Sequence, residues 1–280
     1  PLKNRVLDRH RHVVVVPQRL RLEPNQVPGV GGRDRDRRRH LAAGLQGADR
    51  GVVVGPEVLQ FPPVGVLAGL RQAGPARARI ERLPPFLDPA PYRRAARKRT
   101  LLRMRLAMAC RLPPEQPWMV AAAMMRPGDK LASYDMLART LRLLPDLPWQ
   151  LLVAGDGAAR APVEAVLRDA GGDRVHLLGA CDARSMAALY AACDLCIWPA
   201  VNEAYGMAML EAQAAGTAVV SCATRGVPDV VQHGTTGLLA PTQDAQALAH
   251  CARALLTDRS RCRAMGLAAA QFVARERSLA

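Results

Sequence analysis

From about residue 112 to its end, the chain alternates short apolar runs with longer segments whose apolar residues recur at helical spacing. Short apolar runs bounded by turn residues predict buried strands, and the longer periodic segments predict helices. The predicted strands are 118–125, 149–155, 175–179, 194–200 and 217–223. Helices lie between them, and two more, around 243–256 and 259–275, close the chain. This alternation predicts a Rossmann-like α/β domain over 112–280, with a parallel sheet covered on both faces.

Residues 1–78 lack this alternation. Apolar runs at 13–16 and 51–55 are separated by Arg-, Pro- and Gly-rich stretches without a helical period. Three interpretations stay open: a degenerate N-terminal lobe, a disordered basic arm, or translation of a wrong reading frame of GC-rich DNA. We favour the last, because the local signals agree on no single fold. The N-terminal lobe is therefore expected to be incomplete, degenerate or disordered.

The segment 79–111 joins the two parts. Its Pro-rich beginning, 80–92, predicts an extended chain. The following stretch, 93–112, predicts one basic helix whose Arg and Lys side chains face solvent.

The net charge of +15 is confined to the first 111 residues: 1–78 and 79–111 carry +8 each, whereas 112–280 carry −1. Nucleic-acid-binding surfaces interleave cations with aromatic side chains, and Phe61 is the one aromatic residue of 1–78. This argues against a nucleic-acid partner. Peripheral contact of the basic region 1–111 with a membrane remains an expectation.

Seven cysteines, with Cys193 and Cys196 at C-x-x-C spacing, raise the question of a disulfide or zinc site. No second Cys/His pair follows at zinc spacing, so we interpret them as small buried residues of a reducing, cytoplasmic compartment. No apolar run is long enough for a transmembrane helix. The chain begins without Met or a signal-peptide pattern, so a fragment is expected.

Candidate chemistry follows the strands, because ligands of an open parallel sheet bind beyond the carboxyl ends of its strands. Arg126 and Lys130, after the first strand, are two cations suited to a diphosphate. Gly155 and Gly179 follow the second and third strands and permit close approach of a ligand. His233, after the fifth strand, is interpreted as a structural turn residue. Dinucleotide, P-loop and serine-nucleophile motifs are absent.

The fourth strand leads into the most informative run. Glu203 is expected in a loop, Gly206 at the beginning of a helix, and Glu211 more than one turn inside it. A glycine at a helix N-terminus lets backbone N–H groups approach a phosphate. Glu203 is then placed to contact a sugar, and Glu211 to accept hydrogen bonds from ribose hydroxyls.

Two runs in this region resemble motifs of the retaining glycosyltransferase family 4 (glycosyl transferase group 1). The run 203–220, E-A-Y-G-M-A-M-L-E-A-Q-A-A-G-T-A-V-V, resembles an E-x7-E motif in the context E-G-F-G-x-x-x-x-E-A-x-A-x-G-x-P-V-V. The run 225–239, RGVPDVVQHGTTGLL, resembles G-G-x-P-E-x-V-x-x-G-x-x-G-x-L. Ala204 replaces the usual glycine and Asp229 the usual glutamate. The resemblance covers about 80–280 and implies the C-terminal domain of a GT-B fold.

The resemblance also implies residue roles. Glu203 would be the catalytic residue facing the donor sugar. Donor binding would fall to the Arg126 and Lys130 side chains at the diphosphate, the backbone of Tyr205, Gly206 and Met207 at sugar and phosphate oxygens, and Glu211 at the ribose. The family spaces that Arg and Lys one residue wider. Cations there would stabilise charge that develops on the leaving nucleotide.

The activity implied is transfer of a hexose from a UDP- or GDP-sugar, with retention, to a saccharide or lipid-linked acceptor, without metal or other cofactor. The acceptor-binding N-terminal domain of GT-B enzymes has no legible counterpart in 1–78. Two interpretations therefore stay open: an incomplete glycosyltransferase, or a non-catalytic nucleotide-sugar-binding fragment or product of a disrupted gene. A nucleotide-dependent epimerase on the same fold would be expected to carry acid/base residues on both lobes.

Overall fold

The computed structural model describes residues 84–278, so the expectations for 1–78 fall outside it. Six strands form one sheet in the order β3-β2-β1-β4-β5-β6, and all neighbouring pairs are parallel. The strands are β1 (Trp118–Ala122), β2 (Gln150–Ala154), β3 (Val175–Gly179), β4 (Leu195–Trp198), β5 (Ala218–Cys222) and β6 (Gly237–Ala240). The expected Rossmann-like parallel sheet is confirmed.

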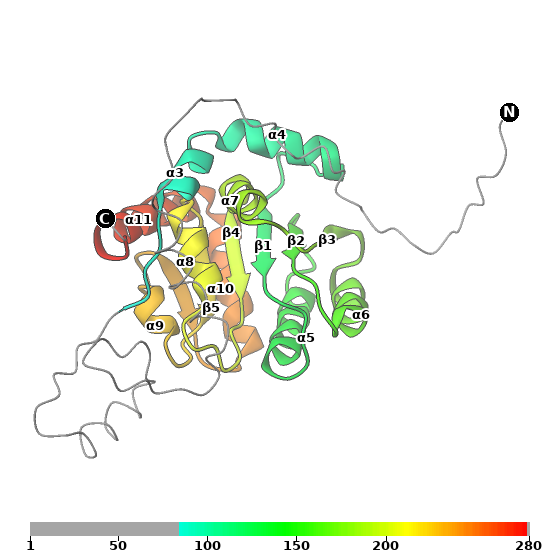
Figure 1. Ribbon diagram of the computed structural model, residues 1–280. Helices are drawn as coiled ribbons and strands as arrows, with labels where there is room; N and C mark the ends of the chain where they lie inside the picture. Colours follow the sequence, from blue (N-terminus) through cyan, green and yellow to red (C-terminus); the bar gives the residue numbers. More distant parts are fainter. Residues whose placement is uncertain (1–83, 279–280) are drawn as a thin grey trace, which may run out of the picture. The chain divides into compact units, whose positions relative to one another are not determined.

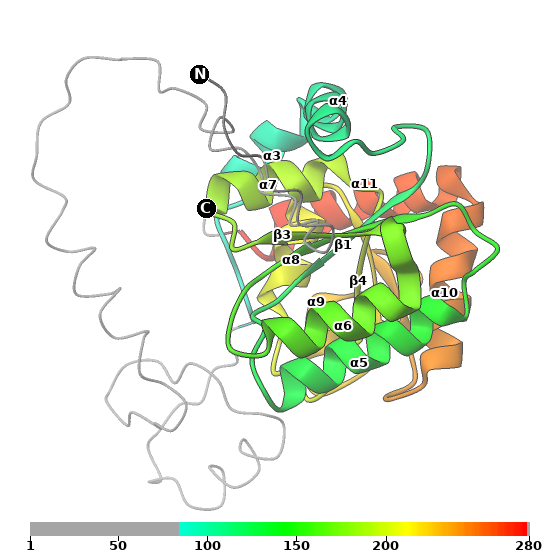
Figure 2. The same cartoon turned by 90° about the vertical axis from the view of Figure 1, so that its right-hand side faces the viewer.

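Helices cover both faces of the sheet (Figure 1, Figure 2). One face carries α5 (Asp129–Arg142), α6 (Arg160–Gly171) and α10 (Ala245–Thr257). The other carries α7 (Ala183–Ala192) and α8 (Met207–Ala214), with α3 (Ala90–Ala96) and α4 (Arg99–Cys110) packed on α7. The helix α11 (Arg259–Glu276) contacts α8, α10 and β5, and a short 3-10 turn, Gly172–Arg174, precedes β3. Among the helices of residues 84–278, none has the length and apolar character needed to cross a bilayer.

The core lies between the sheet and these two layers. Every residue of β2, β4 and β5 is buried, as expected for parallel strands with helices on both faces. The largest fully buried side chains include Trp118, Trp149, Tyr134 and Tyr190. Burial of such aromatic side chains contributes much of the apolar stabilisation of the domain.

Three local predictions were wrong. The helix predicted over 93–112 is two helices, and α3 already begins at Ala90, inside the segment predicted to be extended. The first strand ends at Ala122 rather than 125. The loop predicted after β5 contains a short helix, α9 (Val227–Val230), and the strand β6. At Gly237 of β6, a Cβ would lie 2.3 Å from the carbonyl oxygen of Val219, so a glycine there allows β6 to pack against β5.

The solvent-facing arginines predicted for α4 need a correction as well. Arg99 and Arg103 form ion pairs of 2.6 and 3.0 Å with the two carboxylate oxygens of Asp194. The backbone N–H of Trp118 donates to the same carboxylate at 2.8 Å. Asp194 thus ties α4 to the amino ends of β1 and β4, and the two arginines are mostly buried rather than solvated.

Candidate functional site

The strand order reverses direction between β1 and β4. From β1 the chain continues outward to β2 and β3, and from β4 it continues the other way to β5 and β6. In open α/β sheets the crevice beyond the carboxyl ends of the strands at such a switch point is the usual ligand site. The segments that begin there are the loop from β1 to α5 and the loop from β4 to α8.

An ion pair between Lys130 and Glu203 joins these two loops. Lys130 is the second residue of α5, Glu203 lies between β4 and α8, and the Lys130 Nζ bonds the Glu203 Oε2. Their side chains are only 16% and 18% exposed. Trp198, the last residue of β4, donates its Nε1–H to the same oxygen at 3.4 Å, and its ring centroid lies 5.6 Å from the Lys130 Nζ. The Glu203 carboxylate is therefore held between an ammonium and an indole N–H.

The loop that carries Glu203 has an unusual backbone. Ala200 and Asn202 have φ angles of 60° and 53°, in the left-handed region that costs a non-glycine residue about 1–2 kcal/mol. The Ser133 hydroxyl accepts the Val201 N–H at 3.0 Å. Such strain persists where surrounding contacts determine the conformation, and it gathers at functional sites.

Side-chain hydrogen bonds extend this loop to two neighbouring segments. The Asn202 Nδ2 donates to the Asp129 Oδ2 at 2.7 Å, and the Arg225 Nη1 donates to the Asn202 Oδ1 at 2.6 Å. Arg225 lies after β5 and itself has a φ of 44°. The chain Asp129–Asn202–Arg225 thus links the loops after β1, β4 and β5 beside Glu203.

Gly206 is the N-cap of α8, with a φ of 77°. A Cβ there would lie 3.5 Å from the Glu203 Cγ and 2.0 Å from the Met209 Cε. The glycine therefore permits both the left-handed turn and the close packing of the Met209 side chain, and Glu203 lies in van der Waals reach of the beginning of the helix. Met207, the first residue of α8, is 41% exposed, and the half-buried Tyr205 packs near Gly226. The structure thus brings Lys130, Glu203 and the N-terminus of α8 together.

Gly155 and Gly179 lie side by side, because the Gly155 N–H donates to the Gly179 carbonyl at 2.8 Å. At Gly155, with a φ of 154°, a Cβ would come within 1.9 Å of the Ala123 carbonyl oxygen. The backbone at position 155 therefore needs a glycine because it lies so close to the chain at the end of β1, whether or not a ligand binds there. Gly179 has a φ of 74°, and its Cβ would meet nothing closer than Arg160 at 3.7 Å, which leaves space at the end of β3.

Arg126 does not join the Lys130–Glu203 pair. It is exposed in the loop before α5, and no ion pair within residues 84–278 engages it. Its role at a diphosphate therefore stays a prediction.

Glu211 has a surrounding of its own. It is half-buried on α8, and the hydroxyls of Tyr92 on α3 and Tyr190 on α7 act on its carboxylate. Burial raises the pKa of Glu211, and these two phenols offset the rise only in part. The Tyr190 hydroxyl is buried near Glu211 without a hydrogen bond of good geometry. Packing of α3 therefore brings a tyrosine to the carboxylate predicted to contact ribose.

Other expectations have plainer outcomes. The His233 Nδ1 accepts the backbone N–H of Leu239 at 3.0 Å, as expected of a structural turn residue. All seven cysteines are free, and five of them are buried. Within residues 84–278 no group of three or more His, Cys, Asp or Glu side chains gathers as metal ligands. The sequence analysis missed Trp198, Asn202 and Arg225. Trp198 could have been noticed as a tryptophan at the end of a predicted strand, and Arg225 as an arginine where the family motif has glycine.

Comparison with known proteins adds the family. The family model described as "Glycosyl transferases group 1" matches residues 117–258, about half of the chain. The chain belongs to this family. Among curated relatives, the D-inositol 3-phosphate glycosyltransferase of Nocardia farcinica is 31% identical over 211 residues, covering 72% of this chain and 45% of the relative. That of Corynebacterium aurimucosum is 36% identical over 150 residues, covering 50% of this chain and 36% of the relative. The chain thus matches about half, or less, of the length of these relatives.

Solved structures share the fold. Sucrose-phosphate synthase from Thermosynechococcus elongatus has a TM-score of 0.64 at 26% identity, covering 76% of this chain and 52% of that one. The Anabaena HepE structure with UDP and glucose has a TM-score of 0.61 at 21% identity, covering 77% and 58%. The described domain therefore has the Rossmann-like architecture of GT-B glycosyltransferases.

Proposed function

We propose that this domain binds the donor in hexose transfer from a UDP- or GDP-sugar to an acceptor, with retention of configuration. The observation that carries the proposal is the Lys130–Glu203 pair at the switch point of the sheet, beside the N-terminus of α8. A carboxylate, a cation and free helix amides in one crevice match a sugar joined to a diphosphate.

In this proposal each group has a separate task. Glu203 faces the donor sugar as the catalytic residue, and its orientation is set by Lys130 and Trp198. The backbone of Tyr205, Gly206 and Met207 holds sugar and phosphate oxygens. The N-terminus of a helix attracts anions through its unpaired N–H groups, and the first turn of α8 carries no acidic residue to oppose this.

The diphosphate and nucleoside would lie across the neighbouring loops. Lys130 and the exposed Arg126 compensate the charge that develops on the leaving nucleotide, without a metal ion. The space at Gly179 accepts the base, and Glu211 binds the ribose. For Glu211 to bind the ribose, the ribose hydroxyls must either share the Glu211 carboxylate with the Tyr92 hydroxyl or displace that hydroxyl.

The wider setting is proposed on the same basis. The acceptor is a saccharide or a lipid-linked molecule, and curated relatives named for D-inositol 3-phosphate favour a polar acceptor. The seven free cysteines favour a reducing, cytoplasmic compartment. Contact of the basic region 1–111 with a membrane surface is part of the proposal, and a nucleic acid is not.

Calorimetric titration of the full chain with UDP, UDP-glucose and GDP-mannose tests the donor. We expect binding of at least one nucleotide sugar, and at least about tenfold weaker binding in Lys130→Met. Lys98→Met, an exposed lysine remote from the switch point, is the matched control. Absence of binding to every nucleotide sugar tested overturns the proposal.

Donor hydrolysis and transfer to saccharide acceptors test the catalytic step. Glu203→Gln is expected to abolish turnover while it retains nucleotide binding. Binding without turnover in the wild-type chain would instead support a non-catalytic nucleotide-sugar-binding fragment.

A further inference from the structure

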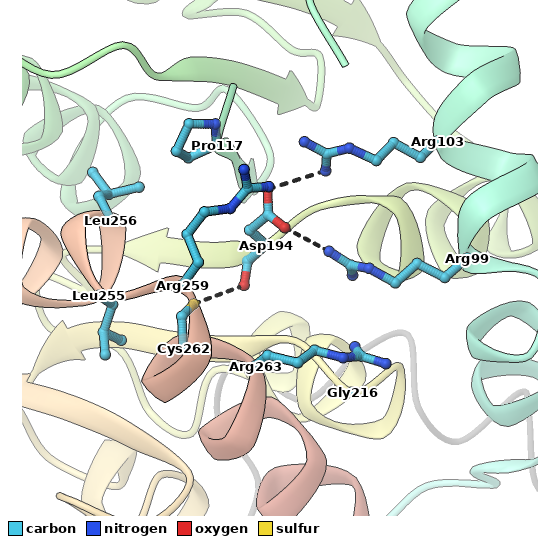
Figure 3. A pocket seen from close by; sticks show the side chains of 10 residues that line it. All are labelled: Arg99, Arg103, Pro117, Asp194, Gly216, Leu255, Leu256, Arg259, Cys262 and Arg263. Carbon is cyan, nitrogen blue, oxygen red and sulfur yellow. Dashed lines mark hydrogen bonds and ion pairs between the residues drawn. The ribbon is translucent and has the colours of Figure 1, made fainter. Parts of the chain in front are cut away.

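A cavity lies at the amino ends of the strands, whereas the proposed donor site lies beyond their carboxyl ends; Figure 3 shows the lining of this cavity. Its lining includes Pro117, Asp194 and Gly216, which precede β1, β4 and β5 respectively. The cavity has a volume of about 250 Å³, below the range of about 300–1,000 Å³ of pockets for drug-sized ligands. A ligand here is therefore smaller than a nucleotide sugar.

The charge of this cavity is strongly positive. Arg99 and Arg103 reach it from α4, and Arg259 and Arg263 reach it from α11. In Figure 3 the Arg259 side chain approaches Asp194 from the side opposite Arg99 and Arg103, and Arg263 extends below Arg99. Four guanidinium groups stand against one lining carboxylate. Like charges four residues apart on one helix destabilise it, and both helices carry such a pair.

Asp194 pairs with the arginines of α4 alone among the four. It forms ion pairs with Arg99 and Arg103, whereas no ion pair within residues 84–278 engages Arg259 or Arg263. Partial burial and the neighbouring charge of Arg99 lower the pKa of Arg263, and the charge of Asp194 offsets this only in part. The two α11 arginines therefore carry positive charge that no ion pair within the described part of the chain neutralises.

The two sides also differ in their free donors. Arg99 and Arg103 spend their N–H groups on Asp194 and on backbone carbonyls, among them those of Ala191, Ala192 and Cys193 at the end of α7. Arg259 uses one nitrogen, at 2.8 Å from the Glu115 carbonyl oxygen. The α4 side thus supplies a rigid positive field, and the α11 side supplies donors ready for a ligand.

We propose that this arginine cavity is a second anion site, separate from the donor crevice, that takes a phosphate monoester or a small diphosphate. The guanidinium groups of Arg259 and Arg263 supply donors that match the oxygens of a tetrahedral anion, and Arg99 and Arg103 add positive charge beside them; arginine also forms bidentate pairs with phosphate. A ligand with a single carboxylate would neutralise less of the arginine charge than a phosphate does. The phosphate could belong to a free small molecule or to a lipid headgroup.

Calorimetry of the full chain with inorganic phosphate and with pyrophosphate, at constant ionic strength set with sodium chloride, tests the site. We expect saturable binding of one anion, weakened at least about tenfold in Arg259→Gln/Arg263→Gln. Both replaced side chains are exposed, and thermal unfolding confirms that the variant folds. Arg261→Gln, an exposed arginine on the same helix outside the cavity lining, is expected to bind as the wild type does.

Saturating UDP and the two sources of phosphate complete the test. Phosphate affinity is expected to be unchanged with UDP present, which separates this site from the donor crevice. The source of the phosphate is tested by sedimentation of the protein with phosphatidylcholine vesicles, with and without phosphatidic acid. If the wild type binds the phosphatidic acid vesicles and the double variant does not, the site takes a lipid headgroup. If the wild type binds neither kind of vesicle, the site takes a free phosphate. Equal phosphate affinity in the wild type and the double variant, or competition by UDP, overturns the proposal.

Discussion

The Lys130 ammonium and the Glu203 carboxylate, 73 residues apart in sequence, form an ion pair across the switch point of the sheet. Lys130 is fixed by the first turn of α5, and Glu203 by a loop with two left-handed residues. The pair therefore couples the two halves of the domain at the proposed donor site, and its contribution is measurable without a ligand.

Removal of either partner is expected to lower the free energy of unfolding by about 2 kcal/mol, because the remaining charge is mostly buried and loses its partner. In Lys130→Met/Glu203→Gln, we expect a coupling energy of about 1–2 kcal/mol between the two sites. Urea unfolding of the four proteins measures it. Strictly additive single effects would show that the pair has no energetic role.

Asp194→Asn is expected to destabilise the domain by about 2–4 kcal/mol, since it removes the carboxylate that two mostly buried arginines share. Asp146→Asn is the matched control, because Asp146 pairs with Arg253 at an exposed position and surface pairs contribute little. Chemical unfolding of both variants gives the comparison. Equal losses in the two would contradict the role assigned to Asp194.

Stability should depend on pH through Glu211. The pKa of Glu211 is raised in the folded protein, and its ordinary value in an unfolded chain is about 4.3. At pH values between these two pKa values, the folded protein keeps the Glu211 proton and the unfolded chain releases it. The free energy of unfolding of the wild type, relative to Glu211→Gln, therefore falls as pH rises through this interval and is constant above it. Thermal unfolding from about pH 4 to about pH 7 tests this, with the partly exposed Glu164→Gln as control. A relative stability that rises with pH would refute it.

Arg225 combines a left-handed backbone with a hydrogen bond to Asn202. Both Arg225→Gly and Arg225→Ala lose that bond, but only glycine relieves the backbone strain. We expect the glycine variant to be more stable than the alanine variant by about 1 kcal/mol. Chemical unfolding midpoints of the two variants test this. If the alanine variant is the more stable, the loop relaxes its backbone strain when the Arg225 guanidinium is lost.

Predictions for residues close together in the sequence were confirmed. The strand, the loop with Glu203 and the glycine before α8 are consecutive in sequence, so their relation follows from chain connectivity. The same applies to Lys130, which follows β1 by a short loop. The strand order then places these two loops side by side, as expected for the carboxyl ends of a parallel sheet.

Contacts between distant segments were not predictable in this way. Arg99 and Asp194 are 95 residues apart, and charge pattern alone predicted a solvated helix face. Tyr92 reaches Glu211 only because α3 packs against α7 and α8. The strand β6 was missed because four residues, GLLA, between turn residues carry too short a pattern to distinguish a strand from a loop.

The strand order has a further consequence for folding. The strands β1 and β4 are neighbours in the sheet, yet β2 and β3 lie between them in sequence, so their pairing closes a long loop whose entropy must be overcome before the contact forms. Pairs with such sequence separation slow folding relative to local contacts. The proposed donor site thus comes into existence only when both halves of the sheet have joined, and nucleotide-sugar affinity would report on completed assembly of the domain.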